Sequence, residues 1–125
     1  YYDKLGSLFD RSNRISETNL NISKFFAYQD FEKVKKIGLY SKVDLVSKMV
    51  QEFPELQGVM GGYYAEKKGY DEEFKIALID QYKPMGQNDR IPRNKLGCIL
   101  SLSNNIDALQ SFFSRKSLMS MSFKE

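Results

Sequence analysis

Apolar side chains recur every three or four positions along most of this chain, which is the spacing of one face of an α-helix. Near the N-terminus, Leu5, Leu8 and Ile15 fall on one such face and predict a helix over residues 1–15. Polar residues 16–19, with the sequence SETN, predict a turn after it. The chain therefore opens as a series of short helices.

Two further helices are expected before the middle of the chain. Residues 20–29 form a short amphipathic pattern, and Asp30 suits the N-cap of the next helix because its carboxylate can accept a hydrogen bond from a free backbone N–H. The next helix is predicted by a stripe of apolar residues: Leu39, Val43, Val46, Val50 and Phe53. Pro54 then suits the first turn of a new helix.

Residues 53–70, FPELQGVMGGYYAEKKGY, continue the helical pattern in spite of closely spaced glycines. Each glycine inside a helix costs about 1 kcal/mol relative to alanine. Gly58, Gly62 and Ala65 recur at intervals of four and three, and they predict a surface on which another helix packs closely. Gly61 has no explanation in this pattern. The glycines lack the GxxxxGK[ST] order of a phosphate-binding loop and follow a helix rather than a strand, which excludes that motif.

Two helices complete the chain. Gly69 is expected to end the preceding helix and Asp71 to cap the next one, while a polar loop at residues 84–92 separates this helix from the last. The apolar core positions of these two helices are Phe74, Ala77, Leu78 and Tyr82, then Leu96, Ile99, Leu102, Ile106, Leu109 and Phe113. The serine-rich tail at 114–125 predicts a frayed end or a segment after a missing loop. The pattern predicts an all-α fold, a compact bundle of about five to seven helices, and one domain over 1–125.

The composition of the chain excludes several kinds of catalytic and metal site. The chain contains no histidine, which removes histidine acid–base catalysis and most zinc sites. Its single cysteine, Cys98, excludes an internal disulfide and is expected to be a buried, inert thiol. Apolar runs are too short for a membrane span and no signal segment is visible, so a cytoplasmic location without membrane contact is expected. Because the chain starts with Tyr1 rather than methionine, we expect a piece of a longer protein.

The net charge of +3 is unevenly distributed. Residues 1–50 hold nine Lys or Arg and six acids, and residues 85–125 hold six and three, so each part carries +3. Residues 51–84 hold four bases and seven acids, which gives −3. Basic ends permit contact with phosphates but equally fit a solvated charged surface.

The middle of the chain resembles the β subunit of the bacterial, two-subunit type of glycyl-tRNA synthetase. The resemblance rests first on residues 44–84, DLVSKMVQEFPELQGVMGGYYAEKKGYDEEFKIALIDQYKP, which keep the spacing of that family's segment. Upstream, KLGSLFDRSNRI at 4–15 and GLYSKVDL at 38–45 resemble family segments, as does RIPRNKLGCILSLSNNIDAL at 90–109. The resemblance covers residues 4 to about 113.

This resemblance implies a helical domain similar to the HD phosphohydrolases, within a large multidomain chain. It also implies a hetero-oligomeric ligase that attaches glycine to its tRNA, in which the α subunit holds the catalytic site with ATP and Mg²⁺. The β subunit would recognise tRNA, and this segment would lie near the acceptor arm. It would have no catalytic site and no cofactor of its own.

The chain also departs from the family. Lys67-Lys68-Gly69 stands where the family often has HDG, and Ser103-Asn104-Asn105 where it has ADK. Asp44 and Asp107 remain, but a true HD hydrolase holds its metal through both histidine and aspartate. We expect these two acids to be solvated or capping groups rather than ligands of a hydrated cation, and we expect the fold to lack metal-dependent hydrolysis.

Two functions remain open for the domain. In the first, it positions tRNA through basic side chains on RNA phosphates and an aromatic side chain stacked on a base. The candidate residues are Lys4, Arg11, Arg14, Lys42, Tyr64, Lys67 and Lys68. Of the tyrosine pair, Tyr63 is expected in the core and Tyr64 at the surface. In the second function, the domain is a structural spacer that holds neighbouring domains or the α subunit, with Gly58, Gly62 and Ala65 serving helix packing.

Overall fold

The computed structural model describes residues 7–124, with the backbone alone described for residues 118 and 120–124. Within these residues the chain forms six α-helices, three short 3₁₀-helices and no strand, which confirms the predicted all-α class. The α-helices are α1 (Leu8–Ser23), α2 (Phe31–Tyr40), α3 (Lys48–Glu52), α4 (Val59–Lys67), α5 (Glu72–Asp80) and α6 (Lys95–Lys124). The 3₁₀-helices are η2 (Lys24–Phe26), η3 (Val43–Val46) and η4 (Pro54–Leu56). The likeness to HD domains stays a prediction.

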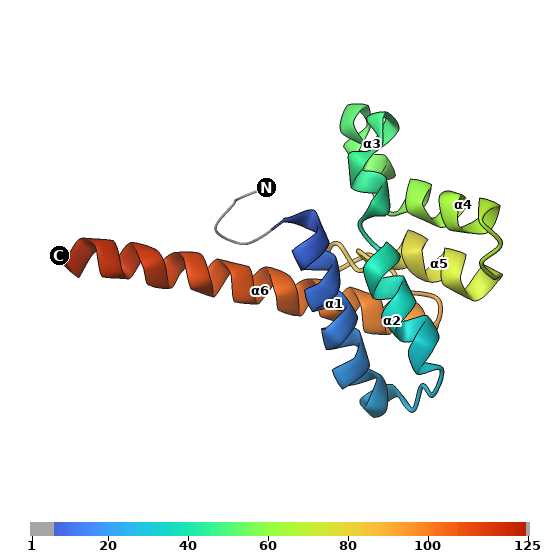
Figure 1. Cartoon of the computed structure of the whole chain (residues 1–125), viewed down its shortest axis with the longest axis horizontal. Coiled ribbons are helices and arrows are strands. Elements are labelled where there is room, and N and C mark those ends of the chain that lie inside the picture. Colours follow the sequence, from blue (N-terminus) through green and yellow to red (C-terminus); the bar gives the residue numbers. More distant parts are fainter. Residues whose placement is uncertain (1–6, 125) are drawn as a thin grey trace.

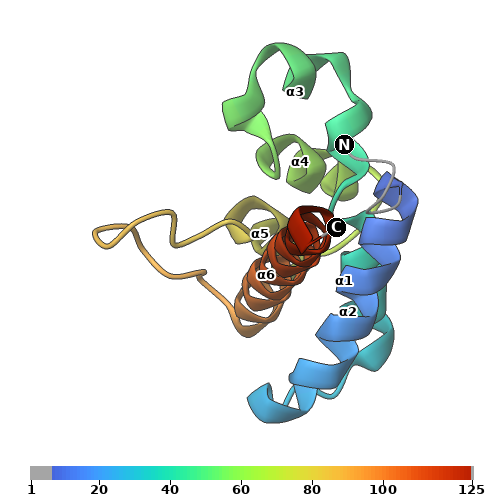
Figure 2. The ribbon, with the colours of Figure 1, turned by 90° about the vertical axis from the view of Figure 1, so that its left-hand side faces the viewer.

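The helices pack as two pairs against the first half of α6. Helices α1 and α2 lie side by side, α4 packs on α5, and α6 contacts both α1 and α5 (Figures 1 and 2). The second half of α6 extends away from this bundle toward the C-terminus (Figure 1). The buried core consists of Ile15, Val34, Ile37, Ala65, Phe74, Ala77, Leu78, Leu96 and Leu100. Among the described residues, no helix combines the length and the apolar character needed to cross a membrane.

Helix α1 runs through the turn that the sequence predicted at 16–19, so that prediction was wrong. The polar residues of this stretch do not reverse the chain; they are buried and contact α2. The Ser16 hydroxyl donates to the Lys35 carbonyl at 2.9 Å, and the Asn19 amide donates to the Val34 carbonyl at 3.1 Å. Opposite them, a Cβ on Gly38 would collide with the Ser16 backbone. These short side chains let the two helices approach closely.

The predicted single helix between Leu39 and Phe53 was also wrong. Helix α2 is correctly capped by Asp30, whose carboxylate accepts from the Lys33 N–H at 3.1 Å, but it ends at Tyr40. Helices η3 and α3 follow as separate short elements. Of the predicted apolar stripe, only Val50 is buried. The breaks between the short elements mean that Leu39, Val43, Val46 and Phe53 no longer lie on one helix face, and these four residues are exposed.

The glycine-containing helix begins later than predicted. Helix α4 starts at Val59, and Gly58 precedes it with φ +84°, a left-handed conformation that favours glycine. Gly58 therefore lies in the turn before the helix rather than in the helix interior. It still packs closely, as predicted, because a Cβ there would lie 3.0 Å from the Leu78 carbonyl oxygen of α5. The packing prediction for Gly62 is confirmed, since a Cβ there would lie 2.7 Å from Ile79 Cγ1 of α5. Ala65 is also confirmed as a core residue.

The local signals at residues 69–71 are confirmed. Gly69 has φ +96°, and the Tyr70 N–H donates to the Ala65 carbonyl at 3.0 Å, which closes a Schellman-type end on α4. Asp71 caps α5 by accepting from the Phe74 N–H at 3.0 Å. The following polar loop is tied down where Arg93 Nε donates to a buried Asp80 oxygen at 2.9 Å.

The apolar stripe of the last helix is buried only in its first part. Leu96 and Ile99 are fully buried, whereas Leu102, Leu109 and Phe113 are 41%, 56% and 60% exposed. The tail was expected to fray or to follow a loop, but α6 is unbroken to Lys124. The core assignment of the second half of this helix was therefore wrong within the described chain.

Candidate functional site

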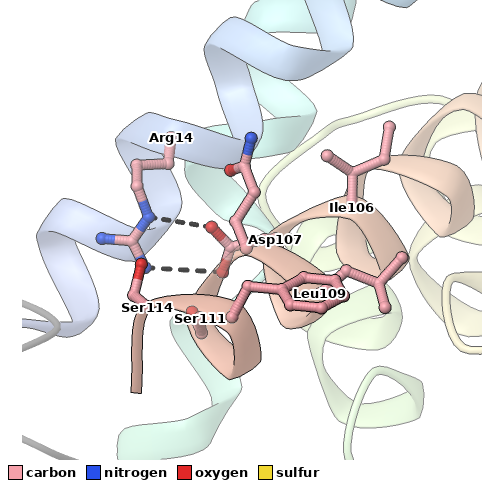
Figure 3. Close-up of a pocket in the computed structure, with 8 residues that line it drawn as sticks. Arg14, Ile106, Asp107, Leu109, Ser111 and Ser114 are labelled. Atoms are coloured by element: carbon pink, nitrogen blue, oxygen red, sulfur yellow. Dashed lines mark hydrogen bonds and ion pairs between the residues drawn. The ribbon is translucent and has the colours of Figure 1, made fainter. Parts of the chain in front are cut away.

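The two arginines of α1 converge on one carboxylate of α6. Arg14 Nε donates to Asp107 Oδ1 at 2.8 Å, Arg14 Nη2 donates to Oδ2 at 3.4 Å, and Arg11 Nε lies 3.5 Å from Oδ2 (Figure 3). The Asp107 side chain is 5% exposed, against 26% for Arg11 and 37% for Arg14. The guanidinium groups, predicted to contact RNA phosphates, are thus engaged in holding α1 against α6.

Lys42, another predicted phosphate contact, is buried. Only 1% of this residue is exposed, and its ammonium donates to Gln81 Oε1 at 3.0 Å and to the Tyr82 hydroxyl at 2.7 Å. The Tyr82 hydroxyl also accepts from Gln57 Nε2 at 2.7 Å. The prediction of a solvent-facing Lys42 is corrected, because the chain turns inward at the end of α2. Its amine makes protein hydrogen bonds that an RNA phosphate would have to replace.

Asp44 joins two elements that are distant in sequence. Its Oδ2 atom, reached from η3, accepts from the Gly58 N–H at 2.7 Å and from the Gly61 N–H at 2.9 Å. A carboxylate at this place satisfies free N–H groups and complements the positive end of the α4 dipole. A Cβ on Gly61 would lie 3.4 Å from the carboxylate, which is an ordinary van der Waals contact. The Asp44 contact therefore explains the role of the residue 61 N–H, but it does not explain why this residue is glycine.

These groups form one buried polar centre, which we define as Arg11, Lys42, Asp44, Gln81, Tyr82 and Asp107. Burial lowers the pKa of the Lys42 amine from 10.5 to about 7; nearby Arg11 lowers it further, while Asp44 and Asp107 oppose the change. Burial likewise raises the pKa of the Tyr82 hydroxyl to about 12. The centre gathers residues from α1, α6 and the segments around η3 and after α5. Lys42 and Asp44 were noted in the sequence, but Gln81 was missed because no local pattern marks it.

The polar centre does not fit the divalent cation of an HD hydrolase. Both oxygens of Asp107 face guanidinium groups, and Asp44 Oδ2 is committed to two backbone N–H groups. Asp44 Oδ1 is buried without a hydrogen bond, and one such oxygen is not a set of metal ligands. The Arg11 guanidinium, together with the protonated form of Lys42, also lies in this centre and would repel a metal ion. In the part of the chain that the structure describes, no three His, Cys, Asp or Glu side chains group as metal ligands.

The remaining predicted RNA contacts lie away from this centre. Lys67 and Lys68 are exposed at the C-terminal end of α4, whereas Asp44 holds its N-terminal end. A helix of this length spans roughly 13 Å, so the lysines and the polar centre do not form one site. Lys4 lies outside the described residues.

The tyrosine pair is reversed relative to the prediction. Tyr63 is 50% exposed and its ring lies 4.7 Å below the Lys75 ammonium, whereas Tyr64 is half-buried. Position on α4 explains the reversal, because Gly61, Gly62 and Ala65 form the buried side of the helix. At 100° per residue, Tyr63 lies roughly 150° from the centre of that side and Tyr64 roughly 105°. Cys98, expected to be buried, is half-buried, and burial raises the pKa of its thiol.

Comparison with known proteins places the chain among synthetase subunits. Residues 1–122 match the family model described as glycyl-tRNA synthetase beta subunit. The glycine–tRNA ligase beta subunit of Thermodesulfovibrio yellowstonii is 46% identical over 113 residues, covering 90% of this chain and 17% of the relative. The beta subunit of Lawsonia intracellularis is 46% identical, over 90% of this chain and 16% of the relative. The beta subunit of Aquifex aeolicus is 42% identical, over 90% of this chain and 17% of the relative. The chain thus spans about one-sixth of the length of the curated relatives it matches.

Proposed function

This chain belongs to the glycyl-tRNA synthetase beta subunit family, and we propose that it acts as a helical part of the β subunit of glycine–tRNA ligase. The observation that carries the proposal is the family match over nearly the whole chain. The enzyme would join glycine to its tRNA with ATP, as a hetero-oligomer in the cytoplasm. An α subunit would hold the ATP and Mg²⁺.

Within that enzyme, we assign this segment no catalytic step. The acids of its polar centre are engaged by the protein itself, through the Arg14–Asp107 pair and the Asp44 contacts with α4. These contacts connect α1, α4 and α6, so the centre serves the arrangement of the helices. The chemistry of glycine transfer then belongs to other parts of the holoenzyme.

The segment would help to position tRNA through exposed bases on the RNA backbone. Lys67 and Lys68 are the best-placed of the predicted contacts, because both are exposed at the turn between α4 and α5. Such contacts give affinity that falls with salt and carry little sequence selectivity. A smaller contribution to tRNA binding is expected from Arg11, Arg14 and Lys42, because their charged groups bond to other parts of the protein and hold the helices together.

The second candidate function is a structural one, in which the segment holds neighbouring parts of the enzyme. The uncovered apolar side of α6 favours it. The two functions are compatible, but tRNA positioning would use the surface around Lys67 and Lys68, whereas the structural function would use the apolar side of α6.

The test is binding of glycine tRNA to the complete α–β enzyme, measured by fluorescence anisotropy across a salt series, beside glycylation of the same tRNA. We expect Lys67→Ala with Lys68→Ala to weaken binding and to reduce the slope of log affinity against log salt by about 1 to 2. Lys24→Ala with Lys48→Ala, two exposed lysines on η2 and α3, is the control that removes the same number of charges away from the α4–α5 turn. Unchanged binding in the double variant would refute the tRNA contact, and a complete enzyme that does not glycylate would refute the family role.

A further inference from the structure

The second half of α6 lies outside the bundle. From Ala108 to Ser117 every position except the half-buried Ser111 is exposed. Isolated helices shorter than about 12–15 residues are marginal in water, because most helical stability in proteins comes from packing of an apolar face. The serines in this half lower its intrinsic helix propensity further. This half continues the buried first half of α6, but packing within the described residues leaves its Leu109 and Phe113 side chains more than half exposed.

An apolar stripe marks the side on which that partner would lie. Leu102, Ile106, Leu109 and Phe113 fall at intervals of four, three and four, so they share one side of α6. At 100° per residue this side is well separated from the one that carries Asp107 into the bundle. Leu109 and Phe113 are each more than half exposed. Contiguous apolar surface of this kind marks an interaction site.

A groove accompanies the stripe. It has a volume of about 610 Å³ and lies beside the Arg14–Asp107 pair, with Ile106 and Leu109 along it (Figure 3). The charged groups at its edge are bonded to each other, which leaves apolar side chains as its main contact surface. Arg14 and Phe113 also line the groove, but the Arg14 guanidinium is already paired with Asp107, so it is less suited to an RNA phosphate. The groove therefore suits another apolar helix face better than RNA.

We propose that this stripe and groove dock an amphipathic helical segment from elsewhere in the same β-subunit polypeptide. The proposal rests on the function proposed above. The curated relatives are about six times as long as this chain, so most of such a polypeptide is available to supply the segment. A tethered segment has an effective concentration that reaches the millimolar range for a short flexible link. A modest apolar contact is then sufficient for docking within one chain, whereas a second, untethered copy would need a stronger contact.

The test is photo-crosslinking in the full-length β subunit that contains this segment, assembled with its α subunit and tRNA. Leu109→p-benzoylphenylalanine places the reactive group on the stripe, and Ala108→p-benzoylphenylalanine is the control at a neighbouring exposed position on another side of α6. We expect the first variant to crosslink to a distant part of its own chain several-fold more than the second. Mass spectrometry would map the product, and mixing isotope-labelled with unlabelled β subunits would distinguish products within one chain from products between chains.

A crosslink to a second β chain, to the α subunit or to tRNA would overturn the proposal, and so would equal or absent crosslinking in the two variants. Both substitutions replace exposed side chains, and unchanged far-UV circular dichroism would verify that the fold is retained. Glycylation is measured on the same samples. Its loss with an intact crosslink would count against the proposed function alone, whereas its retention without a crosslink would count against the docking surface alone.

Discussion

Replacement of Lys42 by methionine should abolish a pH dependence of stability that the buried amine creates. In the folded chain the pKa of this amine is about 7, mainly because burial disfavours its charge. In the unfolded chain it returns to its ordinary value near 10.4. Between these values the unfolded state binds more protons than the folded state, so the free energy of unfolding rises with pH.

The magnitude follows from the two pKa values. One pH unit contributes up to about 1.4 kcal/mol per proton, and the folded amine is still half protonated at pH 7. Integration from pH 7 to pH 9 gives an increase of about 2 kcal/mol for the native chain. The Cys98 thiol, whose pKa burial raises, acts in the opposite direction near pH 9, but it is present in both chains and cancels in their difference.

The assay is urea unfolding followed by far-UV circular dichroism at pH 7, 8 and 9. Methionine fills a similar volume without an ionisable group, so the Lys42→Met chain should lack the increase of about 2 kcal/mol that the native chain shows. The difference in slope is the readout, because loss of the hydrogen bonds to Gln81 and Tyr82 shifts the variant equally at every pH. Lys36→Met, an exposed position on α2, is the control and should keep the native slope. Equal slopes for the native and Lys42→Met chains would refute the reasoning.

Three further changes test the packing around the polar centre, each by urea unfolding. Asp44→Ala should cost about 3 kcal/mol, because it leaves two backbone N–H groups of α4 without their charged acceptor, and Asp44→Asn should cost less; equal costs would contradict this. Gly62→Ala should destabilise the chain by about 1–3 kcal/mol although helix propensity alone predicts a gain of about 1 kcal/mol, since the new Cβ would lie 2.7 Å from Ile79 Cγ1. Arg14→Ala and Asp107→Ala, combined in a double-mutant cycle, should show a coupling of about 1 kcal/mol, and independent effects would mean that the pair does not join α1 to α6.

Local signals in the sequence predicted local structure well. Asp30, Gly69 and Asp71 mark helix ends because each acts on backbone groups within a few residues. The all-α class followed in the same way from apolar spacing. Gly62 was predicted as a packing position because small residues at helical intervals report the approach of a neighbour, here α5.

The polar centre could not be predicted in this way, because its members meet only in three dimensions. Lys42 resembles any surface lysine in the sequence, and its burial depends on acceptors that lie about 40 positions later. Asn19 illustrates the same limit, since a polar residue that suits a turn instead bonds the backbone of α2. For Leu109 the periodicity placed the residue on an apolar side of the helix, but the assignment to the core was wrong because periodicity does not say whether another element packs on that side.

The contact from Asp44 to α4 closes a loop of the chain, and closing a loop lowers its conformational entropy. Because this carboxylate holds the N–H groups of Gly58 and Gly61, residues 45–57 form a closed loop fastened at both ends. Doubling the length of a flexible loop costs only about 0.6 kcal/mol. Only Phe53 separates α3 from η4, and the buried Val50 and the Gln57–Tyr82 hydrogen bond anchor the segment on either side of it. An insertion at Phe53 should therefore be tolerated better than one between Gly58 and Gly61, where one added residue would move an N–H away from the acid. The two N–H groups fix the start of α4, and the segment before them is the part of this loop that accepts a change in length at lowest cost.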